Sequence, residues 1–212
     1  MSDEQLTALA IAAGDGDRAA LAEFIRSTQR DVWRFVAHLT DVQSADDLTQ
    51  ETFLRAMGSL PRFAGRSTAR TWLLSIARRV VVDRFRSAAA RPKKANVEDW
   101  QQTLEQHRRD HDVPDFPEEV AIAELLRALP DDRREAFVLT QVLGLSYAEA
   151  AQTVGCPVGT IRSRVARARE TLIIELRAAD GHRQADAEPI VASVRLLPGA
   201  RGSAAAGFAE VV

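Results

Sequence analysis

The stretch LSYAEAAQTVGCPVGTIRSRVARARETL, Leu145 to Leu172, decides the fold of this chain. Ser146 followed three residues later by Glu149 forms a capping box, which predicts the start of a helix. Gly155 predicts the end of that helix, because glycine accepts the left-handed backbone that closes many helices. Pro157 then suits the first turn of a second helix. We therefore expect two short helices joined by a tight turn.

The second of these helices has two unlike faces when successive residues are placed about 100° apart. One face is apolar and consists of Val158, Ile161, Val165, Ala168 and Leu172. The other carries hydroxyl and guanidinium groups, from Thr160, Ser163, Arg164 and Arg167, with Arg162 and Arg169 on a flank. Such a helix suits the major groove of DNA, where these side chains reach bases and phosphates. A charged surface helix in an ordinary bundle is the alternative.

Charge is distributed in blocks along the sequence, although the formal net charge is only −2. Residues 1–60 contain 10 acidic and 5 basic side chains, and residues 61–94 contain 10 basic side chains and one acidic one. Residues 95–119 reverse the balance again, with 8 acidic and 2 basic side chains. Blocks of opposite sign predict separate surfaces with separate partners.

The single cysteine, Cys156, rules out an internal disulfide. It lies at the turn between the two helices, where we expect a small packed thiol rather than a redox switch. The N-terminus shows no signal peptide, and no apolar run approaches the roughly 18 residues that span a bilayer. We expect a cytoplasmic protein without membrane insertion.

The fold class expected from these patterns is all-α, with two small helical domains joined by a flexible acidic linker. The first domain covers residues 1–90, the linker 91–117 and the second domain 118–177, which contains the two helices of the opening stretch. Residues 178–212 are expected to be a disordered tail. Within the first domain, Asp17 should cap a helix that runs to about residue 38, and Ser44 with Asp47 should open another.

The helix expected at 44–58 divides into two sides. Ala45, Leu48, Thr52, Phe53 and Ala56 should face inward, whereas an outward stripe consists of Asp47, Gln50, Glu51 and Leu54. Polar acceptors around an exposed leucine are typical of a surface that binds an arginine-bearing helix. From the pattern alone, a solvated acidic face is the simpler interpretation.

A basic segment follows, with Arg62, Arg66 and Arg70 in and after a polar loop and then a helix at about 69–87. Trp72, Ile76, Arg79, Asp83 and Arg86 share one side of that helix. Arginines next to an aromatic side chain can hold phosphates and stack an unpaired base. The alternative is that Trp72 is a core residue and the arginines only solubilise the helix.

Three motifs in this order resemble the extracytoplasmic-function sigma factors of the sigma-70 family, and most closely their actinobacterial sigma-C type. They are DVQSADDLTQETFLRA, RFAGRSTARTWLLSIARRVVVDRFR and LPDDRREAFVLTQVLGLSYAEAAQTVGCPVGTIRSRVARARETL. The resemblance covers about residues 5–177. It implies a subunit that joins core RNA polymerase and recognises the −10 and −35 promoter elements, with no catalysis and no cofactor or metal of its own.

The resemblance also implies roles for residues. The outward stripe with Asp47, Gln50, Glu51 and Leu54 would dock on the β′ clamp helices of polymerase, and the second domain on the β flap. The −10 element would be bound by Arg62, Phe63, Arg66, Ser67, Thr68, Trp72, Arg79 and Arg86, with the loop from Phe63 to Thr68 capturing a flipped base. The −35 element would be read by Thr160, Arg162, Ser163, Arg164 and Arg167. An anti-sigma factor is a further partner that the resemblance allows.

Two positions depart from the family pattern, and two other functions compete with it. Arg79 stands where many relatives carry asparagine and Ala69 where many carry an aromatic residue, which leaves the −10 sequence open. A helix-turn-helix regulator that acts without polymerase would explain the second domain alone. A zinc enzyme would need His107 and His111, which are four residues apart, but no glutamate completes a zinc-protease motif.

Overall fold

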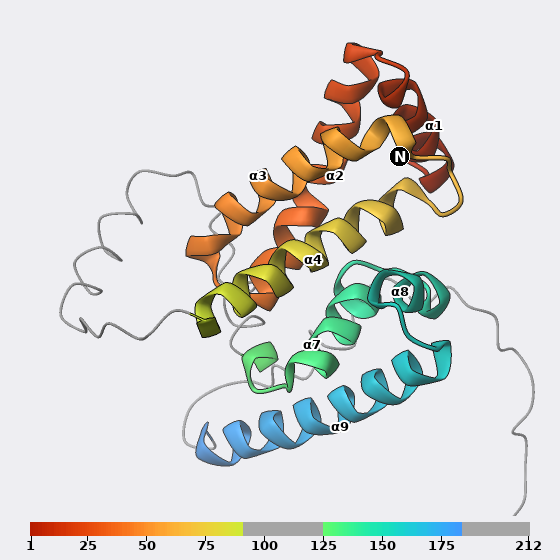
Figure 1. Cartoon of the computed structure of the whole chain (residues 1–212). Helices are drawn as coiled ribbons and strands as arrows, with labels where there is room; N and C mark the ends of the chain where they lie inside the picture. Colours follow the sequence, from red (N-terminus) through yellow and green to blue (C-terminus); the bar gives the residue numbers. More distant parts are fainter. Residues whose placement is uncertain (91–124, 184–212) are drawn as a thin grey trace, which may run out of the picture.

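The computed structural model describes residues 1–90 and 125–183, and both ranges are helical without any strand (Figure 1). This confirms the expected all-α class with two helical domains. The expected linker, most of the expected tail and both His107 and His111 lie outside the described residues. Within these residues, no helix is long and apolar enough to cross a membrane.

The N-terminal domain consists of α1 (Asp3–Gly14), α2 (Arg18–Leu39), α3 (Val42–Ser59), the short 3-10 helix η1 (Leu60–Arg62) and α4 (Ala69–Ala90). Asp17 caps α2 as predicted, since its carboxylate accepts hydrogen bonds from the backbone amides of Ala19 and Ala20. The fully buried side chains at its centre include Phe24, Phe35 and Leu73. Burial of such aromatic and aliphatic side chains, about 1.5–3 kcal/mol each, drives the packing of the four helices.

The predicted capping box at Ser44 and Asp47 is wrong, because α3 begins one turn earlier. Asp41 is the N-cap, and its carboxylate accepts a hydrogen bond of 2.7 Å from the backbone amide of Ser44. The Ser44 hydroxyl also donates to this carboxylate over 3.1 Å. A charged acceptor makes the stronger bond to a free amide at a helix start, so Asp41 takes the position that Ser44 was expected to hold.

The C-terminal domain consists of α7 (Asp131–Phe137), the π-helical turn η2 (Val138–Val142), α8 (Tyr147–Val154) and α9 (Val158–Arg183). The capping box of Ser146 with Glu149 is present, and Gly155 ends α8 with φ of 76°. Both confirm the predictions from the opening stretch. The core side of α9 buries Ile161, Val165, Ala168 and Leu172, whereas Val158 was expected there and is 37% exposed. Val158 is the first residue of α9, beyond the reach of the core.

Two further predictions about this domain need correction. The sequence pattern also predicts a helix from about Asp131 to Leu143. In the structure this helix widens into a π turn, in which the Leu143 amide donates to the Val138 carbonyl five residues back. In addition, α9 continues to Arg183, six residues beyond the expected end at Arg177. Ala178 and Ala179 favour helix, and no glycine or proline lies between Arg177 and Gly181 to end it.

The two domains pack against each other through α4, which lies between the N-terminal core and α8 (Figure 1). Arg70 donates to the Leu143 carbonyl over 2.6 Å and pairs with Asp31 of α2. Farther along α4, Nε of Arg78 donates to the Glu135 carboxylate over 2.7 Å. Burial raises the pKa of Glu135, although the charge of Arg78 opposes this shift. The carbonyl of Leu143, at the end of the π turn, is thus available to Arg70 of α4.

Candidate functional site

The outward stripe of α3 is exposed as the sequence predicts. Asp47 and Gln50 are exposed, Glu51 is half-buried, and Leu54 is 61% exposed. All five residues expected to face inward are buried. Met57, one turn after Leu54, is 38% exposed and extends the apolar part of this surface. Sequence reasoning missed Met57, although its spacing of three from Leu54 on a polar face was a usable signal.

Glu51 is tied into an ion-pair network rather than standing alone on this surface. Arg55 contacts the Glu51 carboxylate over 2.8 Å and the Asp83 carboxylate of α4 over 2.7 Å. Hydrogen bonds to Asp83 and then Glu51 raise the pKa of Arg55. The network joins α3 to α4 at the exposed side of the domain, next to the acidic stripe.

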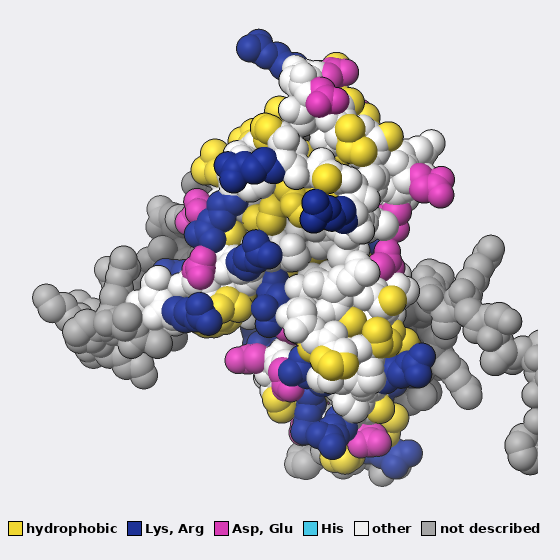
Figure 2. Space-filling model, turned by 45° about the vertical axis from the view of Figure 1, so that its right-hand side comes forward, with side chains coloured by type: hydrophobic (Ala, Val, Ile, Leu, Met, Phe, Trp, Pro, Cys, Tyr) yellow, Lys and Arg dark blue, Asp and Glu magenta, His cyan; other side chains and the backbone are white. Residues whose placement is uncertain are grey.

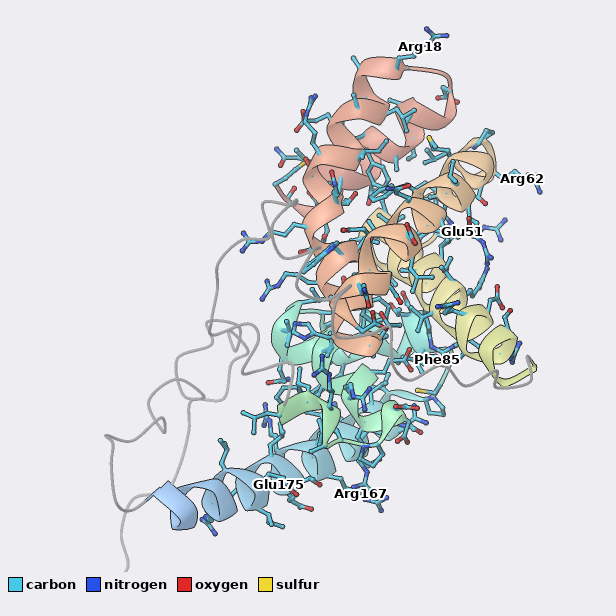
Figure 3. All side chains as sticks on the ribbon, turned by 90° about the vertical axis from the view of Figure 1, so that its left-hand side faces the viewer. Arg18, Glu51, Arg62, Phe85, Arg167 and Glu175 are labelled. Carbon is cyan, nitrogen blue, oxygen red and sulfur yellow. The ribbon has the colours of Figure 1, made fainter. Side chains whose placement is uncertain are left out.

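The polar loop after η1 presents an aromatic pair. The rings of Phe63 and Trp72 lie with centroids 4.8 Å apart and planes tilted by 39°, and both side chains are half-buried. Arg62 and Arg66 are exposed on either side, and Arg62 extends away from the ribbon (Figure 3). A half-exposed aromatic pair flanked by cations can stack a base and neutralise its phosphates.

The end of this loop is anchored from two directions. The Thr68 hydroxyl donates to the Thr71 hydroxyl over 2.8 Å and accepts a bond from the Thr71 amide. The Ala69 amide donates to the Thr7 hydroxyl of α1 over 3.0 Å. Ser67 and Thr68 are half-buried. The loop therefore has a fixed base, which lowers the entropy cost of binding a ligand there.

Basic side chains continue from this loop along α4. Arg79 and Arg86 are exposed and follow Trp72 at intervals of seven residues, which places all three on one stripe of the helix. Figure 2 shows Lys and Arg side chains on both domains of one face of the molecule. The structure thus brings Arg62, Phe63, Trp72, Arg79 and Arg86 onto one side of the N-terminal domain. We call this set the basic-aromatic surface.

Arg70, in contrast, belongs to the domain contact. Its guanidinium group is held by Asp31 and by the Leu143 carbonyl, as described above. Arg70, Leu74, Arg78 and Val81 repeat at intervals of three and four residues and therefore form a second stripe of α4. This stripe faces the C-terminal domain and leaves the basic-aromatic surface exposed.

The outer face of α9 presents Arg162, Ser163 and Arg167 to solvent, and Thr160 is half-buried beside them. Figure 3 shows Arg167 directed away from the molecule. On one flank, Arg169 donates to the Gln141 side chain of η2 over 2.7 Å. This face lies on the far side of α9 from α7 and α8, so it is open to a large ligand.

The placement predicted for Arg164 is wrong. It was expected opposite the core, but it lies on the flank beside α7, where its side chain is 25% exposed and Nε is 3.1 Å from the Asp132 carboxylate. The reason is helical spacing, because Arg164 is three residues after Ile161 and four before Ala168, both buried.

Among the described residues, no group of three or more His, Cys, Asp or Glu could hold a metal ion.

Two family models match this chain. The model for sigma-70 region 2 matches residues 24–91, and the model for sigma-70 region 4 matches residues 119–172. The first range contains the basic-aromatic surface, and the second contains α8 and the part of α9 up to Leu172.

Known proteins are similar over most of the chain. A probable RNA polymerase sigma-C factor of Mycobacterium bovis is 53% identical over 84% of this chain and 95% of its own length. An ECF RNA polymerase sigma-E factor of Haemophilus influenzae is 33% identical over 80% of this chain and 95% of its own. Among solved structures, CnrH in complex with the cytosolic domain of CnrY has a TM-score of 0.63 at 26% identity, covering 82% of this chain and 98% of that one. The sigma factor RpoE of Bartonella quintana, solved with the anti-sigma factor NepR, has a TM-score of 0.53 at 27% identity, covering 71% and 92%.

Proposed function

This chain belongs to the sigma-70 family and is an RNA polymerase sigma factor of the extracytoplasmic-function type, and we propose how its surfaces divide the tasks of that function. Residues 1–90 bind core polymerase and open the −10 element, and residues 118–177 bind the −35 element. Residues 91–117 connect the two, and the tail after 177 has no assigned task. The single observation that carries the proposal is the pairing of the acidic α3 stripe with the basic-aromatic surface on one small domain.

The α3 stripe is the docking surface for core polymerase. Asp47, Gln50 and Glu51 offer acceptors, and Leu54 with Met57 offers apolar area that is exposed in the free protein. A helix that carries arginines between apolar side chains complements this stripe. We assign the coiled β′ clamp helices as this partner and the β flap as the partner of the C-terminal domain.

The basic-aromatic surface opens and holds the −10 element. Arg79 and Arg86 contact phosphates along α4, and Arg62 and Arg66 hold the strand beside the loop. A base that leaves the duplex stacks on Phe63 and Trp72, while Ser67 and Thr68 offer hydroxyls to its polar edge. Stacking on an aromatic side chain contributes about 1–3 kcal/mol, which offsets the few kcal/mol needed to unstack a base.

The outer face of α9 binds the −35 duplex in the major groove. Arg162 lies toward one flank and contacts phosphate, Ser163 and Arg167 reach base edges from the outer face, and Thr160 supports them. Arg164 reaches a base edge from the flank beside α7. The chain contributes binding and positioning, and polymerase supplies the chemistry, so no catalytic group is assigned. It acts in the cytoplasm, where polymerase and promoter meet.

A helix-turn-helix regulator that acts without polymerase is the competing function. It would use α8 and α9 but would leave the exposed Leu54 and the Phe63–Trp72 pair without a role. The relatives named above are sigma factors, and this chain matches 95% of the length of the Mycobacterium bovis and Haemophilus influenzae proteins, which also favours the first function.

Permanganate reactivity of unpaired thymines tests the proposal. A promoter fragment should become reactive around −10 only when both this protein and core polymerase are present. Phe63→Ala should reduce that reactivity, while Phe85→Ala, which removes an exposed aromatic from another stripe of α4, should not. Equal reactivity with and without the protein would contradict the proposal, and specific binding by the protein alone as a dimer would support the competing function instead.

A further inference from the structure

Among the described residues, Arg164 differs from the other arginines of α9 in forming an ion pair with a carboxylate of a different helix. Its Nε lies 3.1 Å from the carboxylate of Asp132, in the first turn of α7. Arg162 and Arg167 are exposed, whereas only 25% of the Arg164 side chain is exposed. An ion pair between two helices holds the side chain in place relative to both of them. An ion pair within one helix restricts the side chain less.

A second carboxylate strengthens this environment. Glu135 lies one turn after Asp132 on α7, and the positive charge of Arg164 acts to lower its pKa. Glu135 is itself paired with Arg78 of the other domain. Arg164 therefore lies beside two acids, and only Asp132 is within ion-pair distance of its guanidinium group.

The geometry points to a positioning role: we propose that Asp132 holds the Arg164 side chain in the conformation that reads a base pair of the −35 element. This inference rests on the proposed function of α9. The contact to Asp132 uses Nε, and the two terminal nitrogens of the guanidinium group carry the donors that can bind two acceptors of a guanine.

Physical reasons support such a role for a carboxylate near DNA. A long arginine side chain loses conformational entropy when it becomes ordered, and a partner that orders it beforehand reduces that cost on binding. An acid at this position without a partner would repel the phosphates, so its pairing with Arg164 also removes an unfavourable charge. As Asp132 is 52% exposed, the pair contributes little to the stability of the fold.

Binding of the polymerase holoenzyme to promoters with every single change in the −35 element tests this inference. Arg164→Ala should lose roughly 5- to 150-fold discrimination at one base pair, as expected for a bidentate arginine contact. Asp132→Asn should lose roughly threefold or more at the same base pair and at no other. Asp132→Glu keeps a carboxylate within reach and should retain the preference.

Asp131→Asn is the matched control. It removes one charge from the same helix start, but Asp131 pairs with Arg134 and not with α9. It should leave the preference at every base pair as it is in the wild type. Thermal unfolding of the aspartate variants should be similar to that of the wild type, because both aspartates are exposed.

The outcomes separate the inference from the function on which it rests. If wild-type holoenzyme prefers certain −35 sequences but Asp132→Asn has the same preferences, Asp132 does not position Arg164. Tighter binding and a sharper preference in Asp132→Asn would mean that Asp132 holds Arg164 away from DNA, which also overturns the inference. If the wild type shows no −35 preference at all, the proposed role of α9 is itself wrong.

Discussion

Phe63 is the residue whose removal should affect the single-stranded −10 element most directly. Phe63→Ala in the holoenzyme should weaken binding of a −10 non-template oligonucleotide by roughly 5- to 150-fold. This factor corresponds to the about 1–3 kcal/mol that stacking of one base on an aromatic side chain contributes. Fluorescence anisotropy with a labelled oligonucleotide measures this, with Phe85→Ala as the matched aromatic control. Equal affinities of wild type and Phe63→Ala would exclude a stacking role for this ring.

His38 should make the stability of the N-terminal domain depend on pH. It is buried, its Nδ1 has no hydrogen-bond partner, and burial followed by the charge of Arg34 lowers its pKa to about 4 from 6.5. Between these values the unfolded chain binds a proton that the folded protein excludes, so stability falls as pH decreases from 6.5 towards 4.

The expected loss between pH 6.5 and pH 5 is ~1.6 kcal/mol in the free energy of unfolding, because the slope rises from about 0.7 kcal/mol per pH unit at pH 6.5, where the unfolded His38 is half protonated, towards about 1.4 at pH 5. Urea unfolding of wild type and His38→Gln at both pH values measures the difference. The variant should lack this part of the pH dependence, whatever its absolute stability. Parallel slopes for the two proteins would show that His38 is protonated alike in both states.

Single residues were predictable where their role is local. Ser146, Glu149 and Gly155 act on amides within a few positions, and the structure confirms them. Arg164 was misplaced because the difference between a flank and an outer face depends on where neighbouring helices lie. Its partner Asp132 lies 32 residues earlier, and no local pattern joins the two.

At the scale of elements, the α3 stripe makes a testable surface. Asp47→Arg combined with Leu54→Arg should weaken binding to core polymerase by roughly tenfold or more, because it places positive charge against a basic partner. Circular dichroism should remain helical, since both side chains are exposed. Gln29→Arg, an exposed change on α2, is the control and should bind as the wild type does. A double variant that co-purifies with core at the wild-type yield would contradict this docking surface.

The buried and exposed faces of the described helices were predictable, but their boundaries were less so. The division of α3 into buried and exposed sides follows from its period and was right. The π turn η2 was not predictable, because its wider ring is stabilised by contacts from distant parts of the chain. One of these is the bond from Arg169 of α9 to Gln141, and another is the bond from Arg70 to Leu143.

In the whole molecule, the packed arrangement places the two proposed promoter-binding surfaces too close together to bind both elements at once. The elements are roughly 25 base pairs apart, about 85 Å at ~3.4 Å per step. Helices in contact have axes about 8–10 Å apart, and α4 contacts α8, which in turn contacts α9. The domains must therefore separate, which requires the Arg78–Glu135 pair to break. The sequence contained no sign of this pair, since its partners lie in different domains.

Glu135→Gln should shift the free protein towards separated domains. The change keeps the shape of the side chain but removes the charge, weakening the domain contact by about 1–3 kcal/mol. Energy transfer between labels at the exposed positions Ala22 and Ile174, in a Cys156→Ser background, reports the separation. Asp83→Asn, which loses an ion pair within the N-terminal domain, should not change it. Identical transfer in the wild type and Glu135→Gln would show that the pair does not hold the domains together.

Run-off transcription with purified core polymerase and a promoter library tests the central claim most directly. With this protein added, core should start transcription at a subset of promoters that share one −35 and one −10 sequence. Asp47→Arg with Leu54→Arg should abolish these transcripts, and Phe63→Ala should reduce them. Core polymerase that gives the same transcripts with and without this protein, under conditions where a known sigma factor is active, would contradict the assignment.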